Sequence, residues 1–111
     1  MRVNDESLMG ILRGLVATDE YLSSAAKWSP RWWQEGVRLS LLGAAFYEGG
    51  ECYQDVEVFL RRLLWTFPGW AGYDLNQFNS DDNINFDSVK SFLQYAIDYC
   101  MWCIAVGVTE V

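Results

Sequence analysis

The spacing of apolar residues predicts helices along most of the chain. They recur at intervals of three and four, and no stretch alternates apolar and polar residues long enough to form a core strand. The clearest segment runs from Ser29 to Gly50. Ser29 is a suitable N-cap, Pro30 fits the first helical position, and Gly49 with Gly50 can end the helix. Trp33, Val37, Leu41 and Ala44 form one apolar stripe, and from Leu39 onward the segment is apolar on most sides, which is typical of a helix surrounded by protein.

Two helices are expected before this segment. Asn4 or Asp5 caps the first, whose apolar residues keep a helical period, and Thr18 caps a second, short helix. Gly10 and Gly14 lie one turn apart on the first helix. In a soluble protein this spacing predicts close packing against a neighbouring element.

Two further helices are expected after it. One begins near Gln54 and ends at Pro68, and the last covers about residues 87–107. The connection between them, residues 68–86, is rich in Gly, Asn, Asp and Ser. Such long connections are uncommon unless they are functional or contain a turn of their own, and Asp74 could cap one here.

These elements predict an all-α protein. We expect a compact single domain over residues 1–111, with four to five helices around a central buried helix at about residues 30–48. A long acidic loop would precede the last helix.

The charge of the chain limits its functions. The net charge is −7 and there is no His, which excludes a His base, His nucleophile pairs and His metal ligands. The excess of acids argues against direct nucleic-acid binding and against anionic membrane surfaces, since both require Lys and Arg. A basic partner fits this charge, although solubility alone also explains an acidic chain.

Nothing in the sequence predicts export or membrane insertion. The first residues are acidic where a signal peptide is basic, and the apolar stretch from Tyr99 to Val108 is too short to span a bilayer. We therefore expect a cytoplasmic protein. An odd number of cysteines, three, fits reduced core residues better than disulfides.

Two motifs suggest chemistry, and each has a simpler explanation. Cys100 and Cys103 form a C-x-x-C, but near a helix C-terminus, where the dipole disfavours a thiolate. Residues 81–87 resemble the start of a calcium loop. However, Phe86 replaces the required Gly and Phe92 the bidentate Glu, and Asx-turns explain the same residues. We predict no metal site.

Catalysis is not expected. The acids fall on predicted outer faces or in loops, so no carboxylate pair is predicted to be buried. The chain also lacks a glycine-rich phosphate loop and a nucleophile elbow. We predict no catalytic residue and no cofactor.

Acidic and aromatic residues are the remaining candidates. One acidic stretch follows the predicted central helix and a second occupies the long loop, and neither contains a base. If they share an end of the bundle they form one negative surface; otherwise they are ordinary solvated turns. The predicted partner-binding residues are Glu48, Glu51, Asp55, Glu57, Trp70, Tyr73, Asp74, Asp81, Asp82 and Asp87.

Aromatic residues make up 16% of the chain, and several lie outside the apolar stripes. Trp65 and Trp102 fall off the stripes of their helices, so we expect exposed tryptophan. Trp and Tyr are enriched at binding hot spots, but in a small domain they also cover the core.

We expect a non-catalytic acidic protein-binding module. It would inhibit or neutralise a basic, nucleic-acid-binding protein such as a nuclease or a CRISPR effector. In size, charge and helical character the chain is similar to inhibitors made by mobile elements and to toxin-neutralising immunity proteins. Some of those cover a nucleic-acid groove with carboxylates that imitate phosphates. The similarity is one of type, because no residue motif matches such a family.

Two alternatives remain open. The first is a self-assembling structural or adaptor protein, such as a homodimer, that buries its surface aromatics against copies of itself. The second is a small-molecule binder with an aromatic pocket between the central helix and the long loop. Salt separates electrostatic binding from apolar self-assembly, because it screens only the former.

Overall fold

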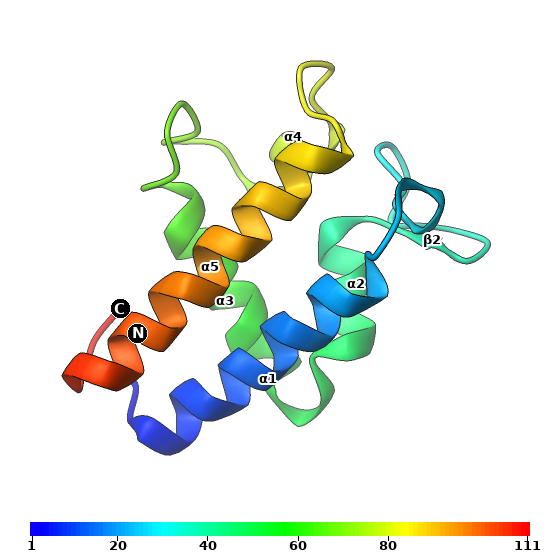
Figure 1. Cartoon of the computed structure of the whole chain (residues 1–111). Helices are drawn as coiled ribbons and strands as arrows, with labels where there is room; N and C mark the ends of the chain where they lie inside the picture. The colour runs from blue at the N-terminus through cyan, green and yellow to red at the C-terminus, as the bar shows by residue number, and fades with distance from the viewer.

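Five α-helices and one short β-hairpin make up the protein, which a computed structural model describes over residues 1–111 (Figure 1). The α-helices are α1 (Asp5–Tyr21), α2 (Leu41–Glu48), α3 (Tyr53–Leu64), α4 (Leu75–Ser80) and α5 (Phe86–Val106). Strands β1 (Gln34–Glu35) and β2 (Arg38–Leu39) pair antiparallel, and 3-10 turns η1 and η2 occupy Ala25–Lys27 and Gly50–Cys52. The prediction of a mostly α-helical protein is confirmed.

Helices α1 and α5 lie side by side and antiparallel (Figure 1). Near one end of the pair, the Leu8 carbonyl oxygen accepts a hydrogen bond from the Cys100 thiol at 3.4 Å. Toward the other end, Lys90 Nζ lies 2.6 Å from Asp19 Oδ1 and also donates to the Asp19 carbonyl oxygen at 2.8 Å. The first and last helices therefore share one core.

Helix α1 continues through Thr18, where the sequence predicts the cap of a second helix. The buried Thr18 hydroxyl donates to the Gly14 carbonyl oxygen at 2.7 Å, so its polar group is satisfied inside the helix. After Tyr21 only the turn η1 precedes the hairpin. The predicted second helix is wrong.

An exposed β-hairpin replaces the first half of the predicted helix at residues 30–48. Gly36, in the turn between β1 and β2, has φ 61°, a left-handed conformation that glycine adopts without strain but that a helix interior does not contain. Val37, expected on the buried stripe, is 72% exposed. The prediction of a helix beginning at Pro30 is wrong.

Helix α2 begins only after Ser40. The Ser40 Oγ accepts a hydrogen bond from the Gly43 N–H at 3.0 Å, so Ser40 is the N-cap in place of Ser29. The first five residues of α2 are buried, and α1, α3 and α4 all contact this helix. The surrounded segment is thus eight residues long, about half the predicted length.

The two glycines of α1 allow close packing, as predicted. A Cβ atom on Gly14 would lie 2.5 Å from Val56 Cγ2 of α3, and one on Gly10 would lie 2.7 Å from the Cys52 Sγ. Glycine at both positions lets η2 and the start of α3 approach α1 closely.

Helices α3 and α5 lie near their predicted positions, but the connection between them is not one long loop. It contains α4, whose N-cap Asp74 accepts a hydrogen bond from the Gln77 N–H at 2.8 Å, as the sequence indicates. Helix α5 is capped by Asn85, two residues before the expected Asp87. Gly107, at φ 72°, ends it.

The side chain of Asn79 joins α4 to the chain before α2. Its Oδ1 accepts hydrogen bonds from Trp28 Nε1 at 2.8 Å and from the Leu41 N–H at 2.9 Å. Its Nδ2 donates to the carbonyl oxygens of Ser29 at 2.9 Å and Pro30 at 3.2 Å. One buried amide therefore fixes both ends of the segment that carries the hairpin.

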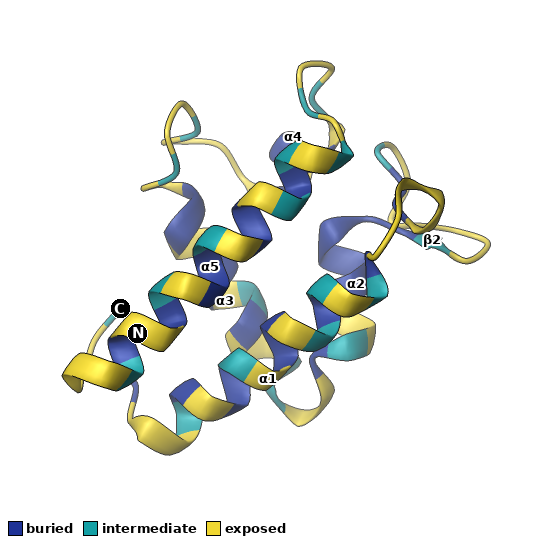
Figure 2. Ribbon diagram, viewed as in Figure 1, coloured by how far each residue is buried: buried dark blue, intermediate teal, exposed yellow.

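Burial is concentrated on the helix faces that meet at the centre, whereas β1 and the turn of the hairpin are exposed and only Leu39 of β2 is buried (Figure 2). None of the helices combines the length and the apolar character needed to cross a bilayer.

Candidate functional site

Four aromatic side chains meet on the surface where the hairpin, α2 and α3 come together. Ring centroids lie 5.4 Å apart for Trp33 and Phe46, 5.5 Å for Trp33 and Tyr47, and 5.0 Å for Phe46 and Tyr53. Trp33, Phe46 and Tyr47 are 43%, 47% and 52% exposed. We call these four residues the α2 aromatic cluster.

The hairpin is held against α2 by specific contacts. The Ser40 N–H donates to the Trp33 carbonyl oxygen at 3.1 Å, and a Cβ on Gly43 would lie 2.5 Å from that same oxygen. The Tyr47 hydroxyl donates to Gln34 Oε1 at 3.1 Å. The cluster is therefore ordered before any partner binds, which lowers the entropic cost of binding.

The first acidic stretch borders this cluster. Glu48 follows Tyr47 directly at the end of α2, and Glu51 and Asp55 lie in η2 and the first turn of α3. None of these three carboxylates is in an ion pair. Glu57 differs, because its Oε1 lies 2.8 Å from Arg61 Nη2, so its charge is balanced locally.

The second acidic stretch has mainly structural roles. Asp74 caps α4, and Asp81 Oδ1 accepts a hydrogen bond from the Asn83 N–H at 2.8 Å, which forms an Asx-turn. Asp82 is exposed, and Asp87 lies in the first turn of α5, where a carboxylate favours the helix dipole.

The loop aromatics divide between the core and the surface. Trp70 is half-buried, with its ring centroid 5.0 Å from that of the buried Phe78. Tyr73 packs on Trp70, with their ring centroids 5.0 Å apart, and remains 44% exposed. Trp70 thus covers the core, and only Tyr73 offers a substantial free surface.

The two acidic stretches do not share an end of the molecule. The turn η2 packs against Gly10 of α1 and lies at the bottom of Figure 1, whereas the loop between α4 and α5 lies at the top. The ten predicted partner-binding residues therefore do not form one surface. Glu48, Glu51 and Asp55 of the first stretch are near Tyr47 and Tyr53 of the α2 aromatic cluster along the chain. The sequence prediction missed this cluster because it placed Trp33 on the apolar stripe of a helix.

No three His, Cys, Asp or Glu side chains are arranged to hold a metal ion. In the segment that resembles a calcium loop, Asp81 and Asn85 accept hydrogen bonds from backbone N–H groups. Asx-turn and N-cap geometry thus explains both residues.

The C-x-x-C cysteines are core residues, as predicted. Cys100 and Cys103 are buried. Burial, and to a smaller extent the charge of the neighbouring Cys103, raises the pKa of the Cys100 thiol to about 11. Burial also raises the pKa of Cys103. Both thiols are protonated at neutral pH, which is unfavourable for redox exchange. Cys52, by contrast, is only half-buried.

A cavity of about 440 Å³ lies near the place where the sequence suggests an aromatic pocket. Trp28 and Phe86 line it, but so do charged residues, among them Arg31, Asp81 and Asp82. It is a mixed polar cleft rather than an aromatic pocket.

Comparison of the chain with family models, curated proteins and solved structures gave no match. The functional proposal below therefore depends on the geometry described above.

Proposed function

We propose that the protein is a non-catalytic binding module that holds a basic protein surface against the α2 aromatic cluster and its acidic border. One observation carries this proposal. Three exposed, mutually packed aromatic side chains lie at and before the end of α2, and the segment that follows carries Glu48, Glu51 and Asp55, none of which is in an ion pair. Aromatic side chains supply contact area, and unpaired carboxylates supply complementarity to Lys and Arg.

A nucleic-acid-binding protein, such as a nuclease or a CRISPR effector, is the partner class that we propose. Such proteins present clustered Lys and Arg to phosphates. Only three of the 15 acidic side chains here are in ion pairs, so the chain has carboxylates free to occupy such a surface. The module would then act as an inhibitor or neutraliser by covering the partner's nucleic-acid groove.

The test is a pull-down from a lysate of the native host, with captured proteins identified by mass spectrometry. We expect the wild-type chain to retain a basic nucleic-acid-binding protein at low salt and to release it at high salt. Replacing Glu48, Glu51 and Asp55 with Lys should abolish retention.

A matched control replaces Asp81, Asp82 and Asp87 with Lys. Each substitution of an acid by Lys raises the net charge by two, so both triple variants change the net charge from −7 to −1. The proposal predicts that this control keeps the partner. Equal losses in the two variants would show that total charge, and not the surface beside the aromatic cluster, controls binding. Full retention by the first variant would refute the proposal.

Self-assembly is a second candidate, favoured by exposed tryptophans that do not belong to this cluster. Trp32 and Trp65 are each 63% exposed, and Trp102 is 54% exposed. Light scattering after size exclusion at low and high salt tests it. An apolar oligomer would persist or strengthen at high salt. A monomer at both salt concentrations would exclude self-assembly.

A further inference from the structure

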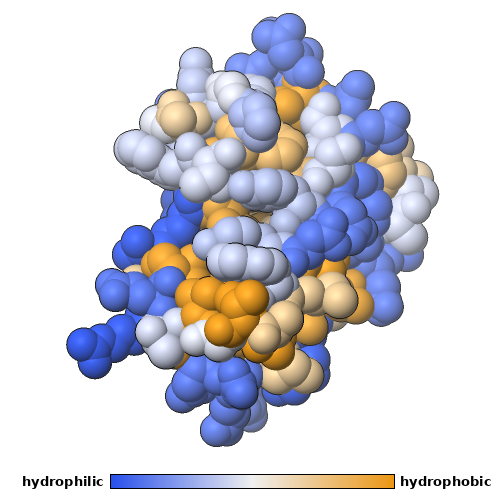
Figure 3. Space-filling view, turned by 60° about the vertical axis from the view of Figure 1, so that its left-hand side comes forward, coloured by the Kyte–Doolittle hydropathy of each residue, from blue (hydrophilic) through white to orange (hydrophobic).

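The largest cavity lies against α3 at the edge of the core, and the buried Leu63 is part of its wall. It has a volume of about 580 Å³ and lies between α3, Tyr99 of α5 and Val111. Figure 3 shows a hollow on this side of the molecule, with apolar side chains in orange at its lower border. The volume falls in the range of sites that enclose small organic ligands.

One outward stripe of α3 supplies four of the eight residues in the wall. Val58, Arg61, Arg62 and Trp65 follow the helical spacing of three, four and seven, so they share one face. Val58 and Trp65 are 40% and 63% exposed, although both are apolar and lie beside the cavity. This apolar area remains available for a ligand to cover.

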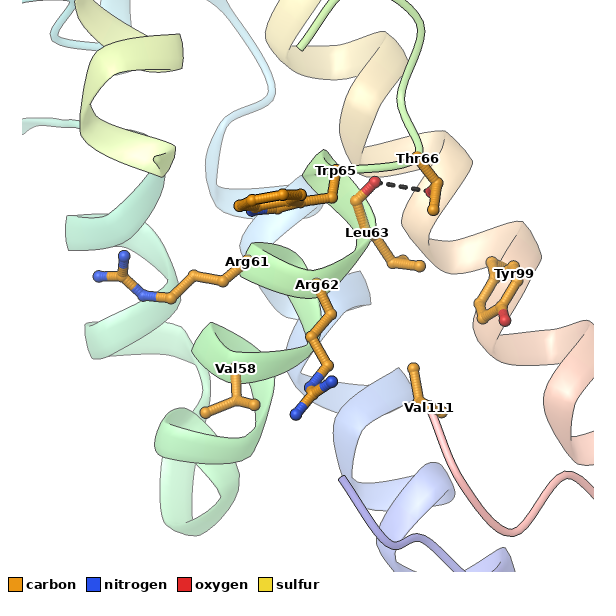
Figure 4. Close-up of a pocket in the computed structure, with 8 residues that line it drawn as sticks. All are labelled: Val58, Arg61, Arg62, Leu63, Trp65, Thr66, Tyr99 and Val111. Carbon is orange, nitrogen blue, oxygen red and sulfur yellow. Dashed lines mark hydrogen bonds between the residues drawn. The ribbon is translucent and has the colours of Figure 1, made fainter. Parts of the chain in front are cut away.

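Arg62 gives the cavity its charge. Figure 4 shows its side chain extending from α3 toward Val111, with Val58 on its other side, whereas Arg61 points away. Arg61 is paired with Glu57, but Arg62 takes part in no ion pair. Five of the eight bases in this chain take part in no ion pair, and Arg62 is the one among them that lines this cavity.

The end of the chain does not neutralise this arginine either. The Val111 backbone oxygen accepts a hydrogen bond from the Met1 ammonium at 3.1 Å, and no ion pair joins Val111 to Arg62. The guanidinium of Arg62 therefore keeps its N–H donors available beside a largely apolar wall.

We infer that this cavity binds a small amphipathic monocarboxylate. A guanidinium presents two parallel N–H donors that match the two oxygens of a carboxylate. One unpaired cation suits one negative charge, and Val58, Trp65, Tyr99 and Val111 would bury the apolar body of the ligand. This site is independent of the proposed protein-binding surface, because none of its wall residues belongs to the α2 aromatic cluster.

Octanoate and octan-1-ol are suitable probes, because they share an apolar chain and differ in charge. The full-length protein is titrated with each, and the indole N–H signals of the six tryptophans are followed by NMR, with Trp65→Phe providing the assignment of Trp65. We expect octanoate to produce a saturable shift of the Trp65 signal. It should bind about tenfold more tightly than octan-1-ol, since only the carboxylate has a negative charge and two oxygens for a bidentate ion pair with the guanidinium.

Arg62→Gln should weaken octanoate binding about tenfold and remove the preference over octan-1-ol. Arg13→Gln is the matched control, because Arg13 is exposed on α1 and takes part in no ion pair, and it should leave binding unchanged. Both substitutions are at exposed positions, and circular dichroism verifies folding. Equal affinity for the two probes, unchanged binding by Arg62→Gln, or equal shifts at all tryptophans would overturn the assignment.

Discussion

Asn79→Ala should be the most damaging single polar substitution in this protein. The substitution removes four hydrogen bonds at once and leaves Trp28 Nε1, the Leu41 N–H and the Ser29 carbonyl without their partner. A buried polar group without a partner costs about 1–3 kcal/mol. Two donors and a carbonyl, partly rehydrated by water entering the space, give an expected loss of about 3–4 kcal/mol. Domains are stable by only about 5–15 kcal/mol, so this loss is a large fraction.

Urea unfolding followed by circular dichroism measures the effect. With a slope of about 1–3 kcal/mol per molar urea, the midpoint should fall by roughly 1–3 M at an unchanged slope. Asn76→Ala is the matched control, because Asn76 is exposed on the same helix and its side chain makes no hydrogen bond; its midpoint should stay near that of wild type. A loss below about 1 kcal/mol for Asn79→Ala would refute the reasoning, since it would mean that the buried groups find other partners.

Asn79→Asp separates the two halves of this network. The carboxylate keeps an acceptor for Trp28 Nε1 and the Leu41 N–H, but it faces the carbonyl oxygens of Ser29 and Pro30 without a proton to donate. We expect it to be destabilised at pH 7 and to recover partly on acidification, when the carboxyl can donate. Equal stability of Asn79→Asp and wild type at pH 7 would show that the two carbonyls do not need this donor.

Four further outcomes are expected. Gly14→Ala should cost about 1–3 kcal/mol in urea unfolding, because its Cβ would lie 2.5 Å from Val56 Cγ2; a stabilised variant would show that α1 and α3 can separate. Lys90→Gln removes a half-buried ion pair with Asp19 and should cost about 1 kcal/mol, an effect that should shrink at high salt. At pH 8, iodoacetamide should label Cys52 well before Cys100, whose pKa of about 11 leaves about one thiol in a thousand ionised; mass spectrometry measures the order. The Cys100 thiol has a pKa near 9 in the unfolded chain and about 11 in the folded protein. Its contribution to the free energy of unfolding should therefore be complete below pH 9 and decline as the pH rises to 11. Cys100→Ala should remove the part of the decline in stability that this thiol causes.

The elements that sequence predicts well are those whose signals are local. The apolar stripe of α3, the left-handed Gly107 and the cap at Asp74 act on their own helices, and each lies at or near the expected position. Gly10 and Gly14 also indicate close packing, because small residues one turn apart have few other uses in a helix.

The segment before α2 could not be predicted in this way, because it contains two good N-caps. Ser29 and Ser40 both precede apolar residues, and a local pattern gives no means of choosing between them. The choice depends on Asn79, which is 38 residues from Leu41 and 50 residues from Ser29 along the chain. Tertiary hydrogen bonds of this kind leave no periodic signal in the sequence.

The same error concealed the candidate site. With residues 30–48 as one helix, Trp33 and Phe46 lie thirteen positions apart along a rod, and Trp33 is assigned to the core. The hairpin instead folds Trp33 back onto the end of α2, where it meets Phe46 and Tyr47. Exposed Trp65 and Trp102 were predictable, because helix phase alone places them outside the apolar stripes.

The antiparallel pairing of α1 with α5 has a consequence for how the chain folds. The hydrogen bond from Cys100 to Leu8 joins residues 92 positions apart, and the bond from Lys90 to Asp19 joins residues 71 apart. Closing so long a loop has an entropic cost that the chain meets before these contacts form. Most helical proteins are dominated by local contacts and fold quickly, whereas here α2 and α3 cover only part of the apolar surface of α1 and the rest stays uncovered until the last helix has been added. The shorter α2–α3 unit can form earlier, but the domain acquires its full stability in one late, cooperative step.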